Sequence, residues 1–205
     1  MTRMVVLIDY ENVRRTARDR FRDPPTRGHV DIVALSEMIA ARSGGALSEI
    51  RVYRGTPNPR RQPVAAAANS RQCDVWSRDR RVVLRRRPLR YLPTADGFSA
   101  AEKGVDVLLG ADLVRIAAEG LHELAVVVSR DTDLVPALEV ARDLSKDLVV
   151  ATAMWAGCSR LRYPRDAAPL PCHVLSAADF RCVEDRTDYT RGNPGASPPG
   201  YPAEP

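Results

Sequence analysis

The sequence predicts a single α/β domain with a mostly parallel central sheet, and two observations carry that prediction. Short apolar runs, which are typical of buried strands, alternate along the chain with segments whose apolar residues recur at helical spacing. The run Met4–Ile8 leads directly into Asp9, and the run Leu124–Val128 leads into Ser129-Arg130-Asp131. This alternation indicates a sheet sandwiched between helices, with its chemistry beyond the carboxyl ends of the strands.

The first half of the chain is expected to alternate between strands and helices. Strands are expected at Met4–Ile8, Leu47–Tyr53 and Val82–Leu84. Helices are expected at the polar, arginine-rich segment Asn12–Phe21, at Ile32–Arg42 and at the alanine-rich segment Pro63–Arg78. Asp31 is a typical N-cap for the second of these helices, and Gly44-Gly45 ends it. Leu89–Ser99 contains Pro93 and Gly97 and is expected to be a loop.

The second half contains the strongest helical pattern, at Ala100–Ala118, where leucine, isoleucine and valine recur on one face. Strands are expected at Leu124–Val128, Leu148–Ala153 and Cys172–Leu175, a helix at Leu134–Leu144 and a final turn at Ala177–Phe180. From Asp185 onward, proline, glycine, serine and charged residues replace apolar ones. We therefore expect one domain over residues 1–184 and a disordered tail over residues 185–205.

The charge of the chain is basic but unevenly distributed. Its 205 residues include 31 Lys and Arg against 26 Asp and Glu, for a net charge of +5. Residues 51–90 hold twelve arginines and only two acidic residues, Asp74 and Asp79. Such a stretch suits contacts with phosphate groups, although a solvated arginine-rich face explains it equally well. We expect Arg54, Arg60 and Arg61 to be among the residues that contact nucleic acid.

Several classes of protein are disfavoured by the composition. The four cysteines are far apart and form no Cys-x-x-Cys pair, which argues against a zinc ribbon and does not suggest a disulfide framework. No apolar run is long enough to span a bilayer, and the N-terminus leads directly into a strand without the pattern of a signal peptide. A cytoplasmic protein without membrane contacts is expected.

Acidic residues occur in three separate clusters. Asp9 follows the first strand with Asn12 close behind, Asp106 follows Lys103, and Asp131 and Asp133 follow the strand that ends at Val128. Carboxylates that converge at one sheet edge repel one another, by roughly 4 kcal/mol for two charges ~4 Å apart at an effective dielectric of about 20. A hard divalent cation such as Mg²⁺ or Mn²⁺ removes this repulsion and could activate water at a phosphodiester.

Each acidic residue also has a purely structural interpretation. Asp131 or Asp133 could be the N-cap of the helix that follows, and Asp106 could lie on an exposed helix face. Asp112 is interpreted as a solvated helix position rather than as part of the site. The prediction of a metal site therefore rests on the combination of the clusters, with Lys103, Ser129 and Asn12 as candidates for contacts to a phosphate or a carboxylate.

The three clusters resemble the motifs of the NYN domain family, which belongs to the PIN-like nuclease superfamily and includes the LabA/DUF88 group. The matching segments are Val6–Asn12, Lys103–Val107 and Ser129–Leu134, in the order of the family. The resemblance implies a PIN-like three-layer α/β/α sandwich and an Mg²⁺- or Mn²⁺-dependent ribonuclease. Carried over by motif, Asp9, Asp106, Asp131 and Asp133 become the metal ligands, and Asn12 and Lys103 become supporting catalytic residues.

The third motif departs from the family pattern at two positions. Arg130 stands where the family usually has a small residue, and Leu134 stands where an aromatic residue is usual. Arg130 and Ser129 could bind RNA phosphate, or Arg130 could occlude the metal. An active site and a non-catalytic, RNA-binding or regulatory site are thus both compatible with the sequence.

The preferred prediction is an endoribonuclease that acts on single-stranded or structured RNA. The alternative is a non-catalytic RNA-binding or regulatory protein on the same fold, and the protein could act alone, as a homodimer or with a protein inhibitor. A phosphohydrolase of the haloacid dehalogenase type is disfavoured because Glu11 stands where its motif needs a second Asp. A dinucleotide-binding domain is disfavoured because no glycine-rich loop follows the first strand.

Overall fold

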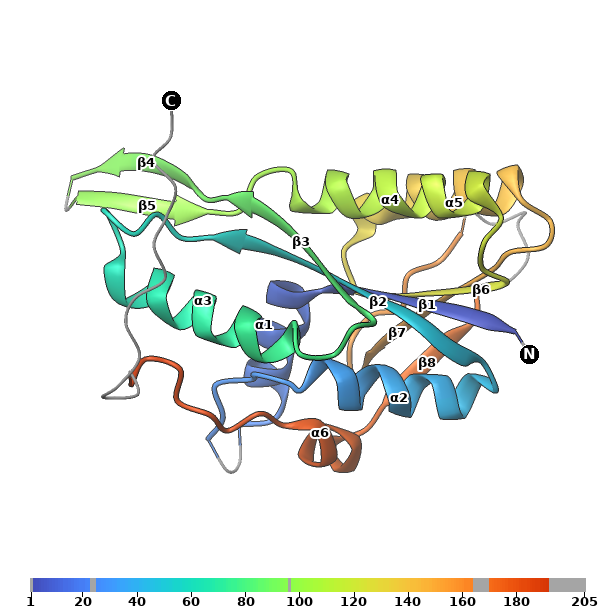
Figure 1. Cartoon of the computed structure of the whole chain (residues 1–205), viewed down its shortest axis with the longest axis horizontal. Helices are drawn as coiled ribbons and strands as arrows, with labels where there is room; N and C mark the ends of the chain where they lie inside the picture. Colours follow the sequence, from blue (N-terminus) through green and yellow to red (C-terminus); the bar gives the residue numbers. More distant parts are fainter. Residues whose placement is uncertain (1, 23–24, 96, 164–169, 192–205) are drawn as a thin grey trace.

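A six-stranded parallel sheet forms the middle layer of the structure, and helices cover both of its faces (Figure 1). The structure, a computed structural model, describes residues 2–22, 25–95, 97–163 and 170–191. The strand order is β3-β2-β1-β6-β7-β8, and all neighbouring strands in this sheet run parallel. The predicted α/β sandwich with a mostly parallel sheet is confirmed.

The elements have the following bounds. The strands are β1 Arg3–Asp9, β2 Ala46–Thr56, β3 Val82–Pro88, β4 Arg90–Thr94, β5 Gly97–Ala101, β6 Leu124–Val128, β7 Val149–Trp155 and β8 Cys172–Leu175. The helices are α1 Tyr10–Arg20, α2 Ile32–Ser43, α3 Pro63–Trp76, α4 Val105–Glu119, α5 Val135–Leu144 and α6 Ala177–Val183, with a 3-10 turn at Thr132–Leu134 before α5.

Alternate residues of β1 supply the cores on the two faces of the sheet. Val6 and Ile8 pack into a buried cluster with residues of α1, α2 and α6. Val5 and Leu7 pack into a second cluster with residues of α4 and α5. Because successive side chains of a strand point to opposite faces, the uninterrupted apolar run that predicted β1 is what a strand covered on both faces requires.

Helix α2 begins and ends where the sequence predicts. The carboxylate of Asp31 accepts hydrogen bonds from the backbone N–H groups of Val33 and Ala34. Gly44 ends the helix with φ of 68°, a left-handed conformation that glycine adopts at little cost. Helix α1, in contrast, starts at Tyr10, two residues before the predicted start, and although the segment is polar and arginine-rich, Tyr10, Val13 and Ala17 are buried.

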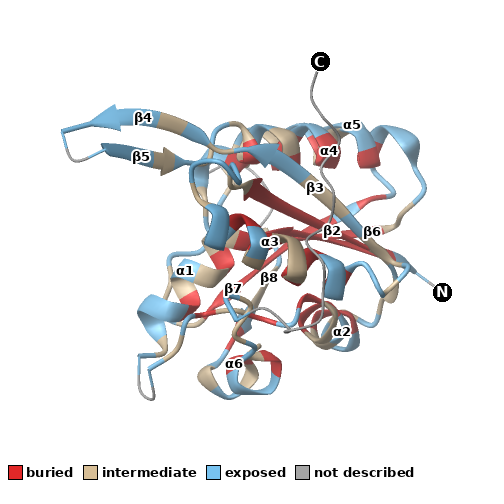
Figure 2. Cartoon of the chain, turned by 60° about the vertical axis from the view of Figure 1, so that its left-hand side comes forward, coloured by how far each residue is buried: buried red, intermediate tan, exposed pale blue. Residues whose placement is uncertain are grey.

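The loop predicted at Leu89–Ser99 is wrong. Residues Arg90–Thr94 and Gly97–Ala101 pair as the antiparallel strands β4 and β5, which form a separate two-stranded sheet. Both strands of such a ribbon are edge strands, so Pro93 is tolerated although it has no N–H to donate. In Figures 1 and 2 this hairpin extends beyond the main sheet, and most of its ribbon is coloured as exposed in Figure 2.

The helix predicted at Ala100–Ala118 begins later, at Val105. Ala100 and Ala101 belong to β5, and Gly104, with φ of 72°, stands at the N-cap of α4. Lys103 therefore precedes the helix, although the pattern at Ala100–Ala118 places Lys103 and Asp106 one turn apart on the same helix.

Strands β1 and β6 are neighbours, with Ile8 paired with Val128. The acidic residues that follow these two strands consequently leave the sheet side by side, as the predicted site requires. Within the described part of the chain, no helix is long and apolar enough to cross a membrane.

The segment after α6 contains the boundary predicted at residue 185. The N–H of Asp185 donates to the carbonyl of His29, and Arg71 donates to the carbonyl of Tyr189. Residues 192–205 of the predicted tail lie outside the described residues, so the division into residues 1–184 and 185–205 stays a prediction.

Candidate active site

Asp9 is the most unusual carboxylate of the predicted site. It ends β1, its side chain is buried with 7% of the residue exposed, and it accepts hydrogen bonds from the Ser129 hydroxyl at 3.0 Å and the Asn12 N–H at 3.4 Å. Burial raises the pKa of Asp9 to about 7, and the nearby carboxylates of Glu102 and Asp131 act in the same direction against these hydrogen bonds. Among the described residues, no Lys or Arg forms an ion pair with it.

The turn after β6 is fastened to the turn after β1. The hydroxyl of Ser129, which donates to Asp9, also accepts the N–H of Asp131 at 3.1 Å. The N–H of Arg130 donates to the side-chain oxygen of Asn12 at 3.3 Å. Five residues of two predicted motifs are therefore held in one hydrogen-bonded group, which fixes the distance between the two strand ends.

A cleft of about 390 Å³ opens beside this group. Its acidic lining residues are Asp9, Glu11, Asp19, Glu102 and Asp131, and its basic lining residues are Arg15, Arg20 and Arg130. A cleft lined by both carboxylates and arginines is compatible with a cation held by the carboxylates and a phosphate chain held by the arginines.

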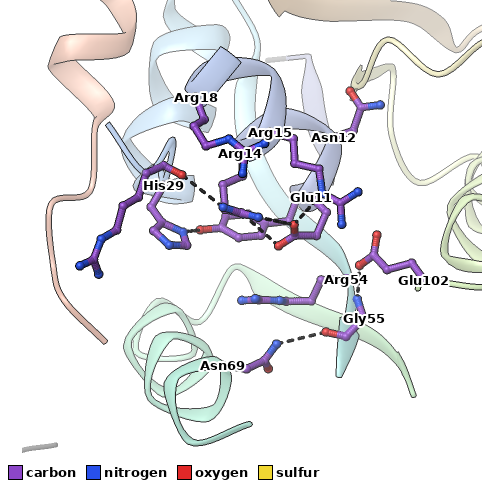
Figure 3. Close-up of polar contacts among 12 residues, drawn as sticks. Glu11, Asn12, Arg14, Arg15, Arg18, His29, Arg54, Gly55, Asn69 and Glu102 are labelled. Atoms are coloured by element: carbon purple, nitrogen blue, oxygen red, sulfur yellow. Dashed lines mark hydrogen bonds and ion pairs between the residues drawn. The ribbon is translucent and has the colours of Figure 1, made fainter. Parts of the chain in front are cut away.

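Sequence reasoning missed Glu102, which follows β5 and lines the cleft. Its carboxylate accepts a hydrogen bond from the N–H of Gly55 at the end of β2, whose carbonyl accepts one from Asn69 (Figure 3). Burial raises the pKa of Glu102. Its position immediately before Lys103 was the available signal, but the assignment of residues 100–118 to one helix concealed it.

The remaining predicted ligands are less closely gathered. Asp106 is half-buried in the first turn of α4, and Asp133 is exposed in the 3-10 turn. Asp131 is the N-cap of that turn, because its carboxylate accepts the Asp133 N–H at 3.0 Å. The sequence predicts an N-cap at either Asp131 or Asp133, and the structure places it at Asp131. Lys103 is exposed. Asp9 and Asp131 share the cleft, whereas Asp106, Asp133 and Lys103 are not among its lining residues.

In the described ranges, no three His, Cys, Asp or Glu side chains are close enough together to form a ready-made metal site. The donor set that faces the cleft nevertheless consists of carboxylate oxygens, which suit a hard cation that keeps several of its waters. Asp9, Asp131 and Glu102 thus fit such an ion in chemical type.

The predicted RNA contacts divide into exposed and buried arginines. Arg60, Arg61 and Arg130 are exposed. Arg54 is buried, donates to Gln72 at 2.8 Å, and lies over the rings of Tyr10 and Trp76 at 4.7 and 5.2 Å. The guanidinium of Arg54 is therefore enclosed by protein and is not on the surface as a contact with RNA requires. Gln72 and Trp76, which enclose it, come from α3, and sequence periodicity does not show where α3 packs.

A buried polar network supports the start of α1 (Figure 3). The Tyr10 hydroxyl accepts from Gln72 at 2.6 Å and lies 2.8 Å from Nδ1 of His29. Glu11 is bound by Arg14 through bonds of 2.8 to 3.2 Å; burial alone would raise its pKa, but Arg14 and Arg54 outweigh burial and lower it. The network fixes the helix turn that carries Asn12.

Asp112 occupies a separate buried site on α4, and the expectation that it is solvated is wrong. Its carboxylate accepts hydrogen bonds from Arg85 at 2.7 and 3.0 Å and from the Tyr53 hydroxyl at 2.9 Å. Arg115 lies 3.3 Å away and Arg51 3.8 Å away. Asp112 is therefore part of an ion-pair network between α4 and strands β2 and β3.

Comparisons with known proteins agree with the fold and the motifs. A family model described as NYN domain matches residues 3–163. A solved structure of a protein of unknown function from Vibrio parahaemolyticus is similar with a TM-score of 0.53 and 17% identity, over 87% of this chain and 94% of that chain. At this identity the likeness shows the fold alone. No curated protein matches the chain.

Proposed function

This chain belongs to the NYN domain family, which is part of the PIN-like nuclease superfamily, and we propose that it is a divalent-metal-dependent ribonuclease. The reaction is hydrolysis of RNA phosphodiester bonds in the cleft beside β1 and β6. The observation that carries the proposal is Asp9, a buried carboxylate at a strand end that no protein cation among the described residues neutralises. An unpaired buried charge is costly, so its retention favours a bound cation.

Asp9 and Asp131 are the first residues that we assign to the cation, with Glu102 as an addition from the structure. Asp106 and Asp133 remain in the proposed set from their place in the family motifs. When bound, Mg²⁺ or Mn²⁺ neutralises charge on the scissile phosphate and activates the attacking water.

The other residues of the cleft have positioning roles. Ser129 donates to Oδ2 of Asp9 and the Asn12 N–H donates to Oδ1, so together they hold the carboxylate in place beside the cleft. The side-chain oxygen of Asn12 accepts the N–H of Arg130. The side-chain NH2 of Asn12 donates to no acceptor in the described residues, so it is free to donate to a phosphate oxygen. Arg15, Arg20 and Arg130 line the cleft and are suited to the RNA backbone. Lys103, next to Glu102, is assigned to the same phosphate chain.

The second candidate is a non-catalytic RNA-binding or regulatory protein. It is favoured by the lack, among the described residues, of a ready-made group of three ligands. It is also favoured by Arg130, whose side chain lines the cleft at the position where the family usually has a small residue.

The test is cleavage of labelled single-stranded and structured RNAs with Mn²⁺, Mg²⁺ or EDTA. Asp131→Asn and Asp106→Asn should each lower the cleavage rate at least about 100-fold, since each removes a ligand worth several kcal/mol in the transition state. The matched control is Asp147→Asn, at an exposed aspartate with no ion pair among the described residues, which should cleave at the wild-type rate. Unchanged cleavage by both site variants would remove these residues from the assignment. Salt-dependent RNA binding without metal-dependent turnover would select the second candidate.

A further inference from the structure

The β4–β5 hairpin has one face that carries aromatic rings. The register pairs Tyr91 with Ala100 and Pro93 with Phe98, and paired residues of antiparallel strands lie on the same face. The rings of Tyr91 and Phe98 are in contact edge to face, with centroids 5.2 Å apart. Phe98 is 40% exposed although its ring is large and apolar. Tyr91, Pro93 and Phe98 together are called the aromatic face below.

An arginine from a different segment lies on this face. The guanidinium carbon of Arg61 is 5.1 Å from the centroid of Tyr91 and 5.8 Å from that of Phe98. Arg61 is itself exposed. A planar guanidinium beside two rings presents flat π surfaces and a positive charge at the same place, which is the combination that unpaired nucleotides recognise.

The aromatic face is held in place by hydrogen bonds. The Tyr91 hydroxyl accepts the N–H of Asn58 at 2.7 Å and donates to the side chain of Gln62 at 2.9 Å. These bonds tie the segment that carries Arg61 to the hairpin. The arrangement is therefore formed before any ligand binds, and less conformational entropy is lost on binding.

The base of the hairpin reaches the candidate active site. Leu89, just before β4, donates its N–H to the carbonyl of Thr56, and Glu102, just after β5, accepts the N–H of Gly55. A Cβ at residue 55 would lie 2.2 Å from Cδ2 of Leu89 and 2.9 Å from Cγ of Glu102, so a larger residue there would displace both side chains. Because Glu102 and Asp9 line the same cleft, the base of the hairpin adjoins the candidate active site.

The charge around the hairpin favours a polyanion as the occupant. In and beside β3, β4 and the segment tied to Tyr91, five arginines are exposed and have no acidic partner among the described residues: Arg60, Arg61, Arg86, Arg87 and Arg90. Phosphate groups complement such a cluster, whereas a protein partner would need an acidic surface with apolar side chains to match.

We propose that the β4–β5 hairpin is a binding arm for single-stranded RNA, whose unpaired bases stack on the aromatic face and Arg61 while Arg60, Arg86, Arg87 and Arg90 contact phosphates. The inference rests on the proposed function, because it gives that function its substrate class. Bases within a duplex are already stacked on both sides, so the aromatic face selects unpaired segments over duplex RNA.

The experiment measures RNA affinity by fluorescence anisotropy in EDTA, where no metal-dependent cleavage occurs, with a labelled single-stranded oligonucleotide and its duplex as probes. Phe98→Leu keeps an apolar side chain but removes the ring, and should weaken single-strand binding by about 10-fold. Arg61→Ala should have a similar effect. Binding to duplex should change less than 2-fold for Phe98→Leu.

The hairpin supplies its own matched control. Leu92, 44% exposed, pairs with Ser99 and so lies on the opposite face of the same hairpin. Leu92→Ala should leave single-strand affinity unchanged. Phe98→Trp should retain it and add a direct signal, because the fluorescence of the introduced indole is quenched when a base stacks on it.

The outcomes separate this inference from the proposed function. Equal affinity of wild type and Phe98→Leu for the single strand, or equal losses in Phe98→Leu and Leu92→Ala, overturns the arm even if the protein cleaves RNA. Single-strand binding that depends on Phe98 and Arg61 supports the arm even if Asp9 and Asp131 prove non-catalytic. A Phe98-dependent dimer in sedimentation, with no Phe98 effect on RNA, overturns it in favour of a second copy of this chain.

Discussion

Asp9 and Asp112 are both almost completely buried, with 7% and 4% of each residue exposed, but their charges have different partners. Asp112 is contacted by the guanidinium groups of Arg85 and Arg115, and the Tyr53 hydroxyl donates to it. Asp9 accepts hydrogen bonds from one hydroxyl and one backbone N–H, and the nearby carboxylates of Glu102 and Asp131 raise its pKa further. The same side chain at the same depth is thus neutralised in one place and left unneutralised in the other.

The difference distinguishes a structural carboxylate from a candidate functional one. A buried ion pair is stable only when its partners are supplied by the fold, as strands β2 and β3 supply them to Asp112. A buried carboxylate whose pKa is raised to about 7 lowers the stability of the protein unless a ligand compensates it. Clefts that contain such groups are candidates for active sites.

The largest expected effect comes from Asp9→Asn. The amide keeps the size of the side chain but removes the charge, so RNA cleavage should fall by at least about 100-fold. Because the lost charge was unneutralised, the free energy of unfolding in EDTA should stay equal or rise by about 1 kcal/mol. Cleavage assays and urea titrations of the same preparation measure both quantities. A stability loss as large as that of Asp112→Asn would contradict the distinction between the two sites.

Asp112→Asn should show the reverse pattern. It leaves Arg85, Arg115 and the nearby Arg51 without their shared carboxylate, and removal of one member of a buried pair costs about 3 kcal/mol. Cleavage per folded molecule should be retained, because Asp112 does not line the cleft. The matched control is Asp143→Asn, at an exposed carboxylate paired with Arg142, which should leave the melting temperature unchanged. Loss of cleavage in a folded Asp112→Asn protein would place this residue in the active site.

The two aspartates also show what the sequence could predict. The sequence correctly predicts that Asp9 stands at a strand end, because an uninterrupted apolar run precedes it, whereas the structure supplies the pairing of β1 with β6 that brings the two motifs together. Asp112 was assigned to solvent, because its partners Arg51 and Arg85 come from β2 and β3, and only the register of those strands brings them to α4. Local periodicity carries no information on such long-range charge pairing.

The hairpin and Glu102 were missed for a different reason. Strands β4 and β5 are mostly exposed and contain Pro93 and Gly97, so they lack the alternation that identifies a half-buried strand. Their short register is stabilised by contacts at Gly55 and Tyr91 rather than by a core. The helical pattern that starts at Ala100 places Glu102 within a helix, whereas the structure places it between β5 and α4, at the cleft.

Cation binding should distinguish the two aspartates without any RNA. A ligand present at 100 times its Kd stabilises the folded state by about 2.7 kcal/mol, which is a rise of several degrees in melting temperature. Wild type and Asp112→Asn should both show this rise with Mn²⁺ or Mg²⁺ over EDTA, whereas Asp9→Asn should not. Calorimetry of the three proteins in matched buffers measures it. An equal rise in Asp9→Asn would show that the cation binds elsewhere.

The smallest expected effect concerns His29, a partly buried group that is made neutral instead of being paired. Burial, with the charges of Arg14 and Arg54, lowers its pKa from 6.5 to about 4, against the opposite effect of Glu11 and Asp185. Below pH 6.5 the unfolded chain protonates His29, whereas the folded protein does so only near pH 4. The free energy of unfolding should therefore fall by about 2 kcal/mol as the pH drops from 6.5 to 4. The Tyr10 oxygen accepts a hydrogen bond from Gln72, so the Tyr10 hydroxyl donates its own proton to Nδ1 of His29. In His29→Asn, the side-chain oxygen can accept this proton, and no titrating ring remains. Urea titrations at pH 7, 5.5 and 4.5 should show a smaller fall in the variant than in wild type, and equal slopes would exclude His29 as the cause.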